Sequence, residues 1–166
     1  MKRLSLCSIL FICLLSLKTF AQSNQKKAAL DPTSQSYSKS DKIWPYAILE
    51  FDKERDENLF VKNVKRSTLS VSEILDIENL IKKQVKAYNN KNPNQIIARP
   101  DKYYKQFIAV INSNGEKEVW VNCCCSVMPY WKTTIQRTFD GGTCYFHLKI
   151  NLTKNIVYYF NVNGLA

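Results

Sequence analysis

The sequence predicts an α+β domain in which one helix packs on a curved antiparallel sheet of four to six strands. The first observation is a strong helical period in residues 70–90, which is not repeated elsewhere in the chain. The second is a series of strand-like segments and short turns from residue 103 to residue 162. A helix with one apolar stripe is marginal in water by itself, so it needs the strands as a packing partner.

The first 21 residues have the pattern of a signal peptide. Lys2 and Arg3 precede an apolar stretch at 4–17, which is too short to span a bilayer, and small residues at Thr19 and Ala21 allow cleavage near Ala21/Gln22. We therefore expect an exported protein, periplasmic or secreted, whose mature chain has no transmembrane segment. An uncleaved N-terminal anchor is the alternative.

The remaining chain divides into a linker and a single domain. Residues 22–41 are polar and lack periodicity, which indicates a flexible linker, and residues 42–166 are long enough for one α+β core. Because three basic residues and no acidic ones lie in residues 1–21, the net charge of +10 becomes +7 for the mature chain. No block of five basic residues is present, so we expect a solvated basic surface and no specific nucleic-acid partner.

The segment before the helix starts with an apolar run at 43–51, and Pro45 near its start is typical of an edge strand or a strand beginning. The charged stretch 52–58 should be exposed, and its acidic residues are expected to form a solvated turn and not a calcium site. Residues 59–64 are expected to form a short extended piece that leads to the helix.

The helix is predicted to begin at Ser70, which with Glu73 forms a capping box. Glu78 and Lys82 have the i,i+4 spacing of a favourable ion pair. The apolar stripe consists of residues spaced three or four apart, namely Ile74, Ile77, Ile81, Val85 and Tyr88.

Two strands are predicted after the helix, connected by a hairpin turn at Asn114 and Gly115. The first, 103–111, contains five consecutive apolar residues, which indicates a central strand covered at least partly on both faces. In the return strand 118–125, alternation separates two faces: Val119, Val121, Cys123 and Cys125 on one, and Trp120, Asn122 and Cys124 on the other.

The segment 126–142 is the longest break in the second half of the chain. A loop of this length in a compact domain is often functional, and Tyr130 and Trp131 then provide a contact surface. Two other interpretations stay open: a lid whose aromatic residues fold back on the sheet, or an extra strand at 133–139.

The last predicted hairpin consists of strands 144–152 and 156–162. Its first strand alternates, so that Cys144, Phe146, Leu148, Ile150 and Leu152 face the core while Tyr145, His147, Lys149 and Asn151 face away from it.

Four cysteines follow the predicted cleavage site: Cys123, Cys124, Cys125 and Cys144. Export favours a disulfide, and Cys125 and Cys144 should meet at one end of neighbouring strands, both on the core face. Cys123–Cys144 is the alternative. Consecutive strand residues point to opposite faces, so we expect no metal site, and His147 lies on the face opposite Cys144. No cofactor is expected.

The segments GEKEVWVNCCC (115–125), DGGTCYFHLKINLTK (140–154) and NVNG (161–164), with LSVSEI at the helix start, resemble a group of small exported bacterial proteins without assigned activity. This resemblance covers roughly the last third of the chain and implies no particular chemistry. The element order also resembles that of the cystatins, which implies a helix cradled by a curved sheet. However, the turn at 112–116 lacks the Gln-x-Val-x-Gly hairpin with which cystatins contact proteases.

From these patterns we expect an exported, non-enzymatic binding or structural module of the cell envelope, with an unknown protein or an envelope polymer as partner. The expected contact surface consists of Tyr130, Trp131, Tyr145, His147 and Lys149, and no catalytic residue is predicted. Two alternatives are a thiol-dependent redox or metal-binding protein that uses the cluster 123–125, and a cystatin-like protease inhibitor.

Overall fold

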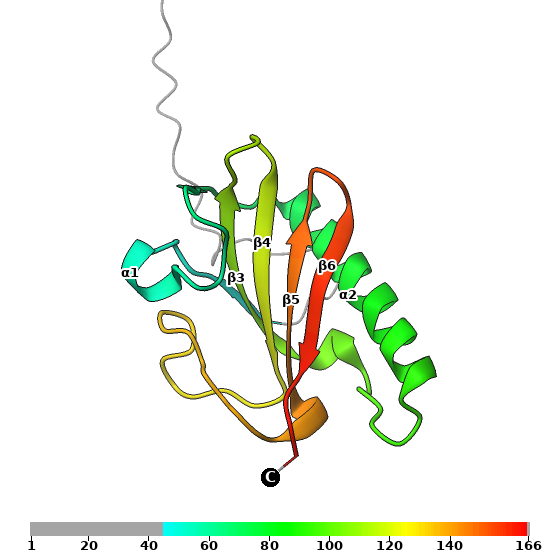
Figure 1. Cartoon of the computed structure of the whole chain (residues 1–166). Helices are drawn as coiled ribbons and strands as arrows, with labels where there is room; N and C mark the ends of the chain where they lie inside the picture. The colour runs from blue at the N-terminus through cyan, green and yellow to red at the C-terminus, as the bar shows by residue number, and fades with distance from the viewer. Residues whose placement is uncertain (1–44, 166) are drawn as a thin grey trace, which may run out of the picture. The chain divides into compact units, whose positions relative to one another are not determined.

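The computed structural model describes residues 45–165. The expected signal peptide 1–21 and linker 22–41 lie outside the described residues, as do the first residues of the expected domain. The elements are β1 (Tyr46–Ile48), α1 (Lys53–Asp56), β2 (Lys65–Arg66), α2 (Val71–Lys91), β3 (Tyr104–Ile111), β4 (Lys117–Cys124), β5 (Tyr145–Asn151) and β6 (Ile156–Val162), with 3₁₀ turns η1 (Pro100–Lys102) and η2 (Gly142–Cys144) (Figure 1). No helix in this part of the chain has the length and apolar character needed to cross a membrane.

The strands form one mixed sheet in the order β1-β3-β4-β5-β6, with β2 also paired to β3. The α+β class with one main helix is confirmed. The expectation of a wholly antiparallel sheet is wrong at one edge, because β1 pairs with β3 in parallel. The reason is the connection: the chain carries α2 across one face before β3 begins, so both strands run in the same direction. The short extended piece expected at 59–64 is found at 65–66 instead.

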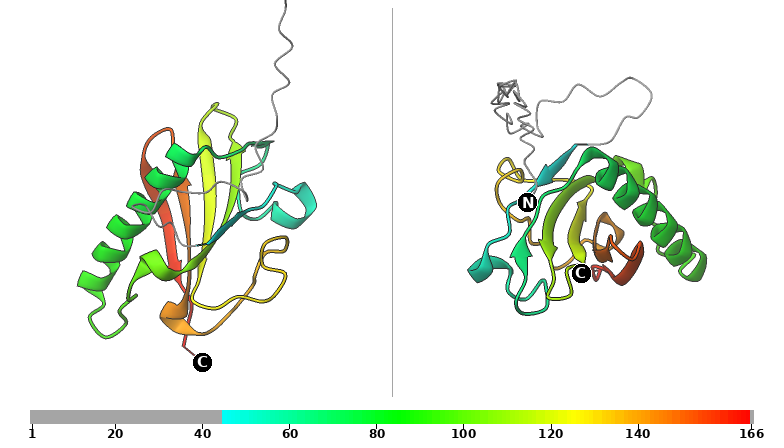
Figure 2. Two further views of the ribbon diagram at one scale, coloured as in Figure 1. Left: turned by 180° about the vertical axis from the view of Figure 1, so that it is seen from behind. Right: turned by 90° about the horizontal axis from the view of Figure 1, so that it is seen from above.

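Helix α2 follows its sequence pattern closely. Ser70 and Glu73 make both hydrogen bonds of the capping box, and the apolar stripe is turned towards the sheet. Figure 2, seen from above, shows α2 lying across one face of the sheet. Glu78 is buried, and its direct ion pair is with Lys105 on β3 and not with Lys82: its Oε1 lies 3.1 Å from Nζ of Lys105. Burial raises the pKa of Glu78, and the Lys82 charge only contributes to lowering it.

Each face of the sheet has its own apolar cluster. The cluster beneath α2 contains alternate residues of the central strands, among them Phe107, Val121 and Phe146. The cluster on the opposite face, which we call the outer face, contains Ile108 and Trp120. It is covered by the segments around β1 and α1 and by the loop 126–142, so the central strand is buried on both sides, as predicted.

The charged stretch 52–58 is exposed except at two positions. Asp56 is fully buried, which corrects the expectation of an exposed turn, while Arg55 is half-buried. The Asp56 carboxylate accepts hydrogen bonds from the Asp52 backbone N–H and from the guanidinium of Arg55. A buried carboxylate is tolerated because its oxygens are paired in this way.

Candidate functional site

The loop 126–142 is fastened to the outer face by two neighbouring side-chain amides, Gln106 on β3 and Asn122 on β4. Gln106 donates from Nε2 to the carbonyls of Trp131 and Thr134 and accepts at Oε1 from the Gln136 backbone N–H. Asn122 donates from Nδ2 to the Gln136 carbonyl and to Oε1 of Gln106. Buried amides that hydrogen-bond to loop backbone groups fix a loop in one position, so this loop is held as a wall above the sheet.

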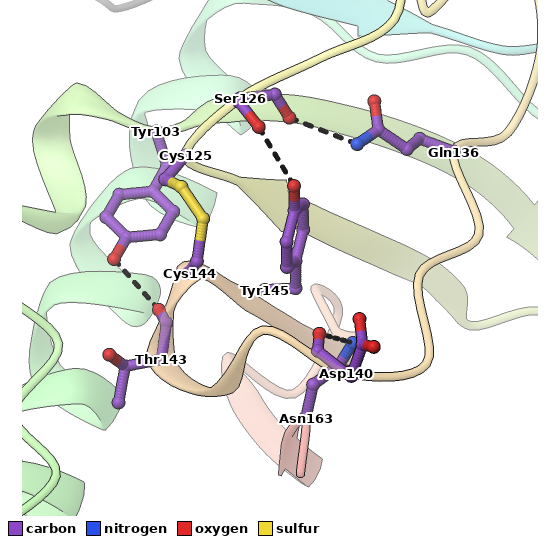
Figure 3. Close-up of a disulfide and its surroundings, with 9 residues drawn as sticks. All are labelled: Tyr103, Cys125, Ser126, Gln136, Asp140, Thr143, Cys144, Tyr145 and Asn163. Carbon is purple, nitrogen blue, oxygen red and sulfur yellow. Dashed lines mark hydrogen bonds between the residues drawn. A yellow bond between two sulfur atoms is a disulfide. The ribbon is translucent and has the colours of Figure 1, made fainter. Parts of the chain in front are cut away.

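A disulfide closes the same loop at its base. Cys125 and Cys144 are bonded, with their Cα atoms 5.0 Å apart, as expected. Figure 3 shows the bridge beside the Tyr103–Thr143 and Ser126–Tyr145 hydrogen bonds. The expectation that both cysteines lie on the core face is wrong, because β4 ends at Cys124 and leaves Cys125 exposed.

Between this loop and the outer face of β5 and β6 lies a cavity of about 350 Å³. We call it the β5–β6 cavity. Its lining residues are Leu59, Trp120, Asn122, Ile135, Gln136, Arg137, Thr138, Phe139, Tyr145, His147, Asn161, Asn163 and Gly164. Two residues of the predicted contact surface, Tyr145 and His147, therefore share this cavity.

The other three predicted residues do not line the cavity. Trp131 is buried and packs edge-on against Tyr104, with 5.4 Å between the ring centroids. The expectation that Trp131 is part of an exposed contact surface is therefore wrong. Its ring folds back on the sheet, as in the alternative interpretation of this loop as a lid. Tyr130 is 58% exposed on the outside of the loop. Lys149 lies over the Tyr159 ring, with its Nζ 5.6 Å from the centroid.

Several lining groups have hydrogen-bonding atoms that the described part of the chain does not use. Asn163 donates from Nδ2 to the carbonyls of Thr138 and Asp140, which leaves its Oδ1 as a free acceptor. Asn122 likewise keeps Oδ1 free, because only its Nδ2 is engaged. Within residues 45–165 the side chains of His147 and Asn161 make no hydrogen bond, although the His147 ring contacts Tyr159 at 5.5 Å. The cavity therefore presents acceptors as well as groups that can donate.

One basic residue, Arg137, sets the charge of the cavity. Among its described lining residues Arg137 is the one permanent cation, and no aspartate or glutamate is present. Burial lowers the pKa of His147, and the neighbouring Lys149 ammonium lowers it further. The imidazole is thus neutral at pH 7, with one donor and one acceptor nitrogen.

The pKa of His147 can be measured directly, because the chain contains one histidine. In a proton NMR titration we expect its ring resonances to shift with a midpoint below the ordinary value of 6.5. A lowered folded-state pKa means that the unfolded state binds this proton more readily. The free energy of unfolding should consequently fall as the pH drops from 6.5 through the folded-state pKa. A midpoint at or above 6.5 would contradict the burial of this ring.

The two other cysteines within residues 45–165, Cys123 and Cys124, are buried free thiols. Burial raises the pKa of Cys123 well above its ordinary value and that of Cys124 to about 12. Thiolates are the reactive and metal-binding form, and these thiols are held protonated. Over residues 45–165, no group of three metal-ligating side chains is found. The burial of Cys123 and Cys124 thus disfavours thiolate chemistry at these two residues.

Thiol chemistry provides a second measurable outcome. For the chain that begins at Gln22, we expect Ellman's reagent to detect no thiol under native conditions and two after denaturation without reductant. Replacing Cys125 and Cys144 together with serine should lower the free energy of unfolding by about 3 kcal/mol, because the bridge closes a loop between residues 19 apart. Rapid native labelling of two thiols would refute the burial of Cys123 and Cys124.

A larger cavity of about 660 Å³ lies along residues 51–64. Its polar lining includes charges of both signs, and the carboxylate of Asp56 is already engaged by Arg55 and by the Asp52 backbone. We therefore favour the β5–β6 cavity, in which polar side chains without partners converge. No protein-family model, curated protein or solved structure matches the chain.

Proposed function

We propose that this domain is an exported, non-enzymatic binding module of the cell envelope, and that the β5–β6 cavity is its contact site. The observation that carries the proposal is a contrast inside the cavity. Its loop wall is held firmly by Gln106, Asn122 and a disulfide. His147 and Asn161, on the strands opposite, have no hydrogen-bond partner among residues 45–165. A preformed site with unused polar groups is what a ligand needs for affinity with little ordering cost.

Binding fits the cavity better than catalysis does. General acid–base chemistry by His147 would need a partner that orients the ring or accepts its proton. The described lining residues include neither a carboxylate nor a thiol, and the imidazole contacts an aromatic ring. The envelope assignment comes from the predicted signal peptide. We expect the chain isolated from a periplasmic or secreted fraction to begin at Gln22, and a chain that retains residues 1–21 would contradict export by cleavage.

The binding proposal can be tested by retention of envelope material on the immobilised protein. We expect His147→Phe/Asn161→Leu to lose the material that the wild-type chain retains, because both changes remove polar atoms from the cavity. Tyr130→Ala is the matched control, since Tyr130 is exposed in the same loop but does not line the cavity. Circular dichroism establishes that all three proteins are folded. Equal retention by the double variant and the wild type would overturn the proposal.

A further inference from the structure

The first constraint on a ligand of the β5–β6 cavity comes from its acceptors. Oδ1 of Asn122 and Oδ1 of Asn163 accept no hydrogen bond from the described residues. A ligand that displaces water from them without donating would leave them unsatisfied, which costs about 1–3 kcal/mol for each group. An inorganic anion or a purely apolar molecule is therefore a poor match. The ligand must bring hydroxyl or amide donors.

The second constraint comes from the aromatic walls. Trp120 and Tyr145 line the cavity, and Phe139 stands at its rim with 91% of its surface exposed. Aromatic rings beside amide groups suit a ligand ring that has C–H groups on its faces and hydroxyls around its edge. Sugar rings have this distribution of apolar and polar groups.

The third constraint is charge. Arg137 is the one permanent cation among the described lining residues, and no acidic side chain opposes it. Its Nη2 makes one long hydrogen bond, 3.3 Å, to the Arg55 carbonyl, which leaves the other guanidinium donors available. A guanidinium with free donors matches a carboxylate in a planar, two-point arrangement.

Together these constraints identify a ligand class, and this step rests on the proposed function of the cavity. We propose that the β5–β6 cavity binds an acidic saccharide, with its hydroxyls on Asn122, Asn161 and Asn163 and its carboxylate on Arg137. The cavity volume of about 350 Å³ is at the lower end of the range for small-ligand sites. It therefore suits the end of a saccharide chain and not a long stretch of it.

The test compares two trisaccharides of equal length by isothermal titration calorimetry, trigalacturonate with three carboxylates and maltotriose with none. We expect trigalacturonate to bind at least about ten-fold more tightly than maltotriose, since a charge-assisted contact is worth more than a neutral one. Arg137→Gln should reduce trigalacturonate binding to the level of maltotriose. Lys149→Gln is the matched control, because Lys149 is a nearby cation on β5 that does not line the cavity; it should change the affinity less than about three-fold at physiological salt.

Three results would overturn the inference: no binding of trigalacturonate to the folded protein, equal affinities for the two trisaccharides, or equal losses in Arg137→Gln and Lys149→Gln. The retention experiment separates this failure from failure of the proposed function. If His147→Phe/Asn161→Leu abolishes retention while trigalacturonate does not bind, the cavity is a contact site for another class of ligand. If the double variant retains envelope material as the wild type does, and trigalacturonate also fails to bind, both proposals are wrong.

Discussion

Glu78→Leu is expected to lower the free energy of unfolding by about 3–5 kcal/mol, because it removes one partner of a buried ion pair. Its partner, Lys105, is fully buried, and the two charges lie 3.1 Å apart beneath α2. Burial raises the pKa of Glu78, while the Lys105 ammonium opposes that effect. Removing the carboxylate leaves an ammonium group in the core that, among residues 45–165, has only the Tyr103 carbonyl as a hydrogen-bond acceptor.

The double variant Glu78→Leu/Lys105→Met provides the control for this prediction. Because it removes both charges and fills the space with apolar atoms, we expect it to recover most of the stability lost in Glu78→Leu. Urea denaturation followed by circular dichroism measures all three proteins. A single variant within 1 kcal/mol of the wild type would mean that the buried pair has little importance for this fold.

Gln106→Leu is expected to lower the free energy of unfolding by about 3–5 kcal/mol as well, and to release the loop from the sheet. The change orphans the buried carbonyl of Trp131 and the partly buried Thr134 carbonyl and Gln136 N–H. An unsatisfied buried group costs about 1–3 kcal/mol, and a partly buried group costs less. The loop should then become sensitive to limited proteolysis within 126–142, although the disulfide still joins its ends.

Asn122→Leu distinguishes a coupled network from independent hydrogen bonds. Asn122 and Gln106 bond to each other and share Gln136 as a partner, so the losses in Gln106→Leu and Asn122→Leu should not add in the double variant. Strictly additive losses, or a loop that stays protected from protease in Gln106→Leu, would contradict the role assigned to the amide pair.

The elements that could be predicted are those whose sequence pattern lies within one short stretch of the chain. Helix α2 and its capping box, the hairpin at Gly115 and the alternation of β5 all depend on residues close together in the chain, and each is confirmed. The Cys125–Cys144 bridge was predictable because strand direction and loop length place the two cysteines together.

The errors concern contacts between distant segments. Lys105 has no local pattern that marks it as buried, and its pairing with Glu78 depends on where α2 crosses β3. Gln106 and Asn122 are directly opposite each other in the β3–β4 register, which a prediction of the hairpin could have indicated. Arg137, Phe139 and Asn161 meet only because the loop is folded back over β5 and β6, so the composition of the cavity could not be predicted from spacing alone.

The parallel pairing of β1 with β3 has a consequence for the order in which the protein folds. Strands β3 to β6 are consecutive neighbours in the sheet, so they can associate through contacts that are short in sequence. Tyr46 pairs with Lys105, and the chain between these two residues includes all of α2. Closing so long a stretch of chain is slow and entropically unfavourable. We therefore expect β1 to pair last, after β3 to β6 have formed a sheet and α2 has packed on it.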